Sequence, residues 1–148
     1  MRRPDAMADI TGSEKYPDIS GRIWFYQTER GVLVVTEMNG LPKSEDACGE
    51  QIFGCHIHSG SHCSGNKEDA FAETKAHYNP HNCEHPYHAG DMPPLFGNDG
   101  YAFSIFLSDR FRIREIIGRT VIIHLNSDDF HSQPSGNSGM KIACGVIF

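Results

Sequence analysis

The chain has 148 residues, a formal net charge of −6 and a hydrophobic content of 39%. We therefore expect residues 1–148 to form a single domain with one hydrophobic core. The negative charge disfavours nucleic acid or an anionic membrane as a partner. No apolar run approaches the roughly 20 residues of a membrane span. Arg2 and Arg3 are followed by no apolar stretch, so no secretory signal is expected and the chain as given reads as cytoplasmic, or as extracytoplasmic if a signal was removed.

Short alternating runs of apolar and polar residues predict strands along most of the chain. Segment 92–98 contains two prolines, which restrict it to a sheet edge. Segment 109–117 has a helical pattern but is short. The predicted strands are 6–11, 21–28, 31–38, 51–58, 92–98, 101–108, 119–125 and 141–148. Eight short strands of this kind predict an all-β antiparallel sandwich or barrel.

Two long irregular segments, 59–90 and 126–139, interrupt this pattern. Loops of this length inside a small domain are usually functional. Each follows a predicted strand that carries a histidine at or near its end, His58 and His124. We therefore expect the functional site to lie in these two loops.

The end of the first loop, AHYNPHNCEHPYHAGD (76–91), concentrates metal-ligand residues. Its histidines follow a helical spacing, but Pro80 and Pro86 exclude a helix. The ligand candidates are His77, His81, His85, His88 and Asp91. A loop carrying imidazoles and a carboxylate can fold around a metal ion, and this donor set suits tetrahedral zinc.

A second group of imidazoles lies on predicted strands. His56 and His58 project from one face of their strand, whereas Cys55 and Ile57 point to the other face. His124 adds an imidazole from the end of another strand. Two imidazoles on a rigid strand form half of a site for copper or zinc.

Several motifs together resemble those of the copper/zinc superoxide dismutase family, in order and in approximate spacing. They are GCHIH (54–58), HYNP (77–80), HAGD (88–91), GRTVIIH (118–124) and GNSGMKIACGVI (136–147). The resemblance extends over essentially the whole chain. It implies an eight-stranded antiparallel Greek-key β-sandwich or flattened barrel, immunoglobulin-like, with two long functional loops.

The resemblance also implies a role for each candidate ligand. Copper would be held by His56, His58, His77 and His124, and zinc by His77, His85, His88 and Asp91. His77 would bridge the two metals. Asp128 matches the carboxylate that links a copper ligand to a zinc ligand through hydrogen bonds, and such partners fix imidazole orientation.

The activity that the resemblance implies is the dismutation of superoxide to dioxygen and hydrogen peroxide by Cu(II)/Cu(I) cycling. His77 would leave copper and take a proton when the copper is reduced, and would return the proton to the departing product. The partner implied is thus a small anion, superoxide. The sequence leaves the oligomeric state open between a homodimer and a monomer.

The family pattern assigns two of the five cysteines to a disulfide, Cys63 with Cys144. We expect Cys55 to be a core thiol and assign no role to Cys48 or Cys83. His62 and His81 have no family role and are expected on the surface. We expect the same of His131 in the second loop, although it could instead line the copper channel.

One position departs from the family pattern. Members usually carry an arginine three residues before the last cysteine, beside the copper channel, whereas this chain has Lys141. Lysine keeps the positive charge but lacks the planar fork of donors. We therefore expect an active but slower enzyme.

Two other functions would use part of the same set of residues. A non-catalytic copper/zinc-binding relative, such as a metal buffer or chaperone module, would keep the fold but usually lacks a copper ligand, and none is missing here. A zinc-only structural domain would leave His56, His58 and His124 without a purpose.

Overall fold

The computed structural model describes residues 2–148, and nearly all of its regular structure is strand. The segment with a helical pattern contains only a single short turn, α1 (Ile113–Ile116), and a 3-10 turn, η1 (Ala72–Thr74), lies in the first long loop. The strands are β1 (Ala6–Gly12), β2 (Ser20–Thr28), β3 (Gly31–Asn39), β4 (Ile52–His58), β5 (Asp91–Phe96), β6 (Ala102–Ser108), β7 (Thr120–His124) and β8 (Lys141–Val146). All eight expected strands are therefore present.

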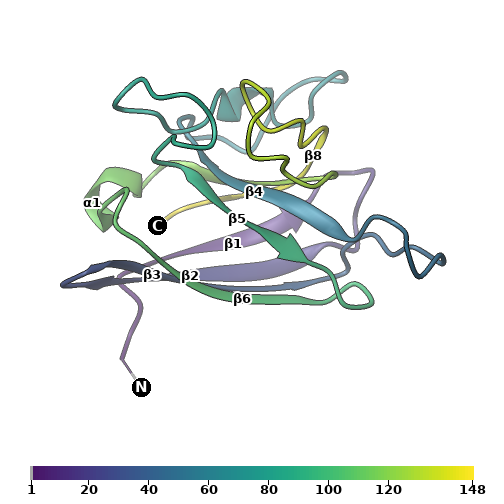
Figure 1. Cartoon of the computed structure of the whole chain (residues 1–148), viewed down its shortest axis with the longest axis horizontal. Helices are drawn as coiled ribbons and strands as arrows, with labels where there is room; N and C mark the ends of the chain where they lie inside the picture. The colour runs from purple at the N-terminus through teal and green to yellow at the C-terminus, as the bar shows by residue number, and fades with distance from the viewer. Residues whose placement is uncertain (1) are drawn as a thin grey trace.

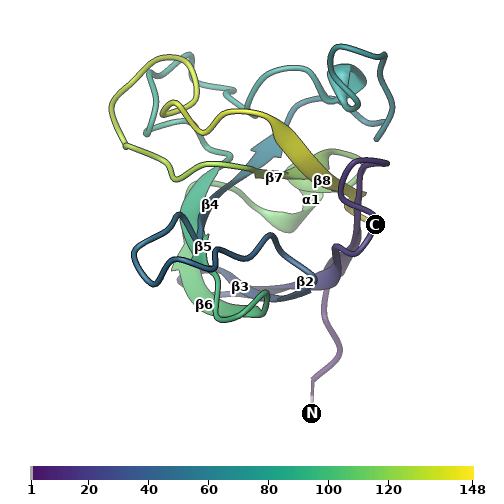
Figure 2. The ribbon, with the colours of Figure 1, turned by 90° about the vertical axis from the view of Figure 1, so that its right-hand side faces the viewer.

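The strands form one curled antiparallel sheet in the order β5-β4-β7-β8-β1-β2-β3-β6. The two end strands, β5 and β6, contact each other without pairing, so the sheet closes into a nearly complete, flattened barrel (Figures 1 and 2). The connections from β3 to β4 and from β6 to β7 cross between the halves of the barrel, as Greek-key connections do. The predicted all-β antiparallel fold is confirmed.

The hydrophobic core fills the space between the two halves of the barrel. Its largest members include Phe25, Phe53 and Phe111, each at most 2% exposed. Burial of one such side chain contributes about 1.5–3 kcal/mol. In β3 buried residues alternate with partly exposed ones, as the sequence pattern predicts.

The strands β4 and β7 differ from β3 because nearly all of their residues are buried, on both faces. The inner face contributes Cys55 and Ile57 to the core. The outer face carries His56 and His58, and it is covered by the long loops, which gather on one side of the barrel (Figure 2). The loops thus create a second, polar interior outside the barrel.

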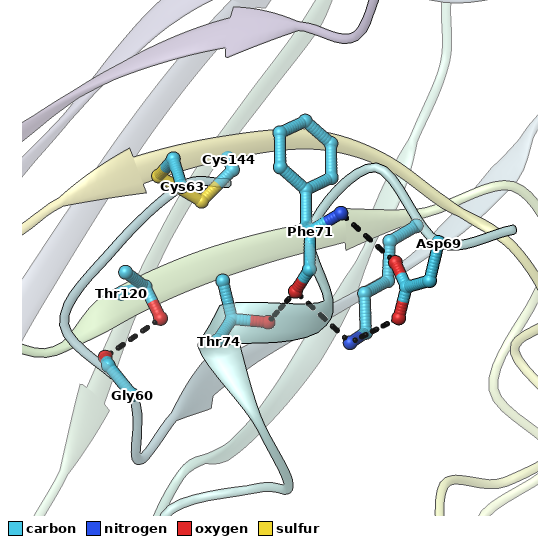
Figure 3. The surroundings of a disulfide bond; sticks show 8 residues. Gly60, Cys63, Asp69, Phe71, Thr74, Thr120 and Cys144 are labelled. Carbon is cyan, nitrogen blue, oxygen red and sulfur yellow. Dashed lines mark hydrogen bonds and ion pairs between the residues drawn. A yellow bond between two sulfur atoms is a disulfide. The ribbon is translucent and has the colours of Figure 1, made fainter. Parts of the chain in front are cut away.

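A disulfide between Cys63 and Cys144 fastens the first loop to β8 across a sequence separation of 81 residues, as expected (Figure 3). The bridge packs with Phe71 and Ile122 in a small apolar cluster beneath the loop. Of the remaining cysteines, Cys48 is exposed, Cys83 is partly buried and Cys55 is buried in the core. Burial raises the pKa of the Cys55 thiol to about 12, so it is an unreactive core thiol, also as expected.

Across residues 2–148, every helix is too short or too polar to cross a membrane.

Candidate metal centre

Four histidines meet on the outer face of β4 and β7. His56 and His58 come from β4, His124 from the end of β7, and His77 from the loop, where it forms an isolated bridge with His58. One ring nitrogen from each lies within 4.8 Å of the others. The His56 and His77 rings are 4.1 Å apart between centroids, and all four side chains are buried.

Each of the three strand histidines has one ring nitrogen hydrogen-bonded to the protein and one left free. His56 Nε2 lies 2.8 Å from Asp128 Oδ2, His58 Nδ1 lies 2.8 Å from the Lys75 carbonyl oxygen, and His124 Nδ1 lies 3.0 Å from the Gly139 carbonyl oxygen. These contacts fix both the orientation and the tautomer of each ring.

The nitrogens that remain are buried and have no hydrogen-bond partner within residues 2–148. They are His56 Nδ1, His58 Nε2, His77 Nε2 and His124 Nε2, together with His85 Nδ1 of the neighbouring cluster. A buried polar atom without a partner is unfavourable, and native proteins leave few of them. Four such nitrogens converging on one point fit a metal ion that accepts imidazole donors, such as copper.

A second cluster lies on the other side of His77. His77 Nδ1 is 2.8 Å from Asp91 Oδ1 and 3.1 Å from His88 Nδ1. Asp91 Oδ2 is 3.1 Å from His85 Nδ1 and 3.2 Å from His88 Nδ1. Three imidazole nitrogens and a carboxylate around one point are a donor set that suits zinc.

His56 also lies near this second cluster, within 4.8 Å of donor atoms of His77, His85 and Asp91. Its free nitrogen, Nδ1, is however one of the four that converge in the first group. We therefore take His88, and not His56, as the fourth residue of the second cluster, because His88 Nδ1 contacts both His77 and Asp91.

Asp128 joins the two clusters through its two carboxylate oxygens. Oδ2 lies 2.8 Å from His56 Nε2, and Oδ1 lies 2.8 Å from His85 Nε2. The side chain is almost fully buried. One residue of the second loop therefore contacts a ring in each cluster and holds its orientation.

Burial keeps the imidazoles of His56, His58 and His124 neutral. Burial lowers the pKa of His56 to about 4, against the opposing hydrogen bond to Asp128, and burial lowers the pKa of His124 to about 3. Burial also lowers the pKa of His58 well below its usual value. Burial alone would raise the pKa of Asp91, but the hydrogen bond from His77 and the neighbouring imidazoles outweigh it and lower that pKa. Neutral imidazole and ionised carboxylate are the forms that bind metals.

Two residues that sequence reasoning did not single out hold the loop of the second cluster. The Gln133 side chain accepts from the His85 backbone N–H at 2.9 Å and donates to the His85 carbonyl oxygen at 2.8 Å. Arg110 donates to the carbonyl oxygens of Pro86 and His88. Neither residue has a sequence signal, because its partners are backbone atoms, three carbonyl oxygens and one N–H.

The remaining histidines, His62, His81 and His131, are exposed. Neither group of clustered donor atoms includes any of them. The crowded segment 76–91 thus contributes His77, His85 and Asp91 to the clustered donors. His88 contacts His77 and Asp91, whereas His81 lies in solvent.

Lys141 begins β8 opposite His124 in the strand ladder. Its positive charge contributes to the lowered pKa of His124, although burial is the main cause. The ammonium Nζ donates to Asp69 Oδ2 at 3.0 Å and to the Phe71 carbonyl oxygen at 3.3 Å. The expected cation therefore lies beside the first cluster, but it is paired with a carboxylate.

This fold and site define a class: β-barrel proteins that carry two adjoining groups of potential metal ligands, with His77 between them. A family model, described as copper/zinc superoxide dismutase (SODC), matches residues 19–147. Superoxide dismutase [Cu-Zn] 2 of Aquifex aeolicus is 30% identical, over 96% of this chain and 85% of that protein. Superoxide dismutase [Cu-Zn] of Legionella pneumophila is 32% identical, over 97% of this chain and 86% of that protein. A crystal structure of a double mutant of a SOD-like protein from Bacillus subtilis superposes with a TM-score of 0.75 at 29% identity, covering 95% of both chains.

The chain belongs to the copper/zinc superoxide dismutase family. The enzyme class is superoxide dismutase, and the cofactors of the family are copper and zinc. The first cluster contains imidazole donors that suit copper, and the second contains imidazole and carboxylate donors that suit zinc.

Proposed function

We propose that this chain is an active superoxide dismutase that binds one copper and one zinc ion. The observation that carries the proposal is the set of four buried imidazole nitrogens that converge without a hydrogen-bond partner. A purely structural zinc domain has no use for them. A family member that had lost copper would be expected to have replaced at least one of these histidines.

We assign copper to His56, His58, His77 and His124, and zinc to His77, His85, His88 and Asp91. His77 is shared because its Nε2 belongs to the first cluster and its Nδ1 to the second. Asp128 positions a ring in each group.

Copper held by these four histidines would supply a one-electron change between Cu(II) and Cu(I), for the oxidation of one superoxide to dioxygen and the reduction of a second, with two protons, to hydrogen peroxide. While its Nε2 is not bound to copper, His77 would hold one of the two protons that the peroxide needs at that nitrogen, and would then deliver it. Its other nitrogen stays fixed by the second cluster, so the proton is carried by an oriented ring. The three strand histidines keep their orientation through their second nitrogens throughout.

Lys141 provides the local positive charge that draws a small anion toward the first cluster against the net charge of −6. A lysine offers three rotatable donors where an arginine offers a rigid fork of five. We therefore expect dismutation to be slower than it would be with arginine at this position.

The decisive experiment is metal analysis combined with a dismutase assay on protein reconstituted with both metals. We expect one copper and one zinc per chain, with activity. His124→Gln should remove copper and activity, whereas His81→Gln, which changes an exposed histidine of the first long loop, should alter neither. Zinc alone, without activity after copper loading, would reject the proposal. Both metals bound without activity would instead support the metal buffer or chaperone alternative.

A further inference from the structure

The Lys141 ammonium is held by the loop that the disulfide fastens to β8. Nζ lies 3.0 Å from Asp69 Oδ2 and 3.3 Å from the Phe71 carbonyl oxygen, and only 17% of the side chain is exposed. An ammonium group has three donors. Two of them are therefore occupied by the protein, and one is left for an anion.

Asp69 is itself fixed before any anion arrives. Its second oxygen, Oδ1, accepts from the Phe71 backbone N–H at 2.9 Å, and its own backbone N–H donates to Asn66 Oδ1 at 2.9 Å. Figure 3 shows its carboxylate turned toward Phe71, in the loop that carries Cys63. The carboxylate is a built part of the loop and cannot swing away freely.

We propose that Asp69 is a positioning residue that holds Lys141 as a partly neutralised cation, so that an anion approaching the first cluster must compete with the Asp69 carboxylate. This inference rests on the proposed function of Lys141 as the guiding cation. Asp69 then sets the affinity of the site for the anion. Its carboxylate weakens the attraction that Lys141 exerts, but it holds the ammonium group in a fixed position.

The substitution that tests it is Asp69→Asn. Asparagine keeps an oxygen for the Phe71 N–H, so the turn is preserved, but it removes the charge and places an amide toward Lys141. The matched control is Glu68→Gln on the same loop, which removes the same unit of charge from an exposed neighbour. A general electrostatic effect would act in both variants, whereas release of Lys141 would act only in the first.

The readout is the dissociation constant of azide, an unreactive anion, followed by the copper absorption of the metal-loaded protein. We expect Asp69→Asn to bind azide about three- to five-fold more tightly, the scale of a partly exposed ion pair. Glu68→Gln should stay close to the unmodified protein. In a Lys141→Gln background, Asp69→Asn should have no effect beyond that of Glu68→Gln.

Unchanged azide affinity in Asp69→Asn, or an equal gain in Glu68→Gln, would overturn the proposal. So would a gain that persists without Lys141. Azide affinity does not depend on turnover, so a protein that binds copper but fails as a dismutase would disprove the proposed function without deciding the role of Asp69. Thermal unfolding of Asp69→Asn checks that the loop remains folded.

Discussion

At the residue scale, the chemistry of the site depends on which nitrogen of each imidazole faces the cluster centre. His56, His58 and His124 present one nitrogen inward because the other is held by a carboxylate or a backbone carbonyl oxygen. Asp128 is the one side chain among these partners, and it serves two rings. It is therefore the place where a single substitution tests orientation without removing a ligand.

Asp128→Asn should weaken metal binding about 10- to 100-fold, the usual effect of losing a partner that orients a ligand. Asparagine has one acceptor oxygen and cannot accept from both His56 Nε2 and His85 Nε2. Chelator competition measures the affinity. Asp129→Asn is the matched control, because Asp129 bonds to Ser132 and to the His131 backbone but to no clustered imidazole. Equal affinities in the two variants would contradict the assigned role.

Lys141→Arg should raise the dismutation rate constant about two- to five-fold, because arginine can contact Asp69 and Phe71 and still present donors to an anion. Pulse radiolysis of the metal-loaded protein measures this rate. Lys67→Arg, an exposed change on the same loop, should leave it unchanged. A rate constant for Lys141→Arg that equals or falls below that of the unmodified protein would contradict the expectation that lysine slows dismutation at this position.

At the element scale, the second long loop must fold tightly enough to bring Asp128 against β4 and the first long loop. Gly136 makes this fold feasible. Its φ is +71°, and a Cβ atom there would lie only 2.6 Å from His85 Nε2 and would overlap Asp128 Oδ1. Any larger residue would push the carboxylate out of its place between the clusters.

Gly136→Ala should therefore lower metal affinity as well as stability. Gly118→Ala is the matched control, because Gly118 also has a positive φ, +84°, but a Cβ atom there meets nothing within 4 Å. Both variants carry the cost of a left-handed alanine, about 1 kcal/mol. Only Gly136→Ala should lose metal in chelator competition; the same loss in Gly118→Ala would show that the effect is general.

At the scale of the whole molecule, the barrel and its loops bury neutral histidines, and this makes the metal-free protein sensitive to acid. The pKa values of His56 and His124 fall to about 4 and about 3, whereas an exposed histidine has a pKa near 6.5. Between these values the unfolded chain binds more protons than the folded chain, so stability falls as the pH is lowered.

We expect the unfolding free energy of the metal-free, disulfide-bonded protein to fall by up to about 1.4 kcal/mol per pH unit for each such histidine between roughly pH 6.5 and pH 4. Urea unfolding at several pH values measures this slope. In His124→Gln the slope should be smaller, because one buried titrating group is absent. A flat profile, or an equal slope in both proteins, would contradict the expected protonation states.

The sequence by itself predicted the eight strands, the two long loops and the two groups of candidate ligands, His56, His58 and His124 on strands and the histidines and Asp91 of segment 76–91 in the first loop. Alternation fixes which face of a strand a residue occupies, so His56 and His58 could be placed together. The resemblance supplied Asp128 and the Cys63–Cys144 pair, which the structure brings to the expected positions.

Only the tertiary structure decided which nitrogen of each ring faces inward and that Lys141 is paired. The partners responsible are the carbonyl oxygens of Lys75 and Gly139 and the carboxylate of Asp69. Every residue has a carbonyl oxygen, and Asp69 is one acidic residue among many. Such contacts depend on how the loops close over the barrel, and that closure brings together atoms that are far apart along the chain.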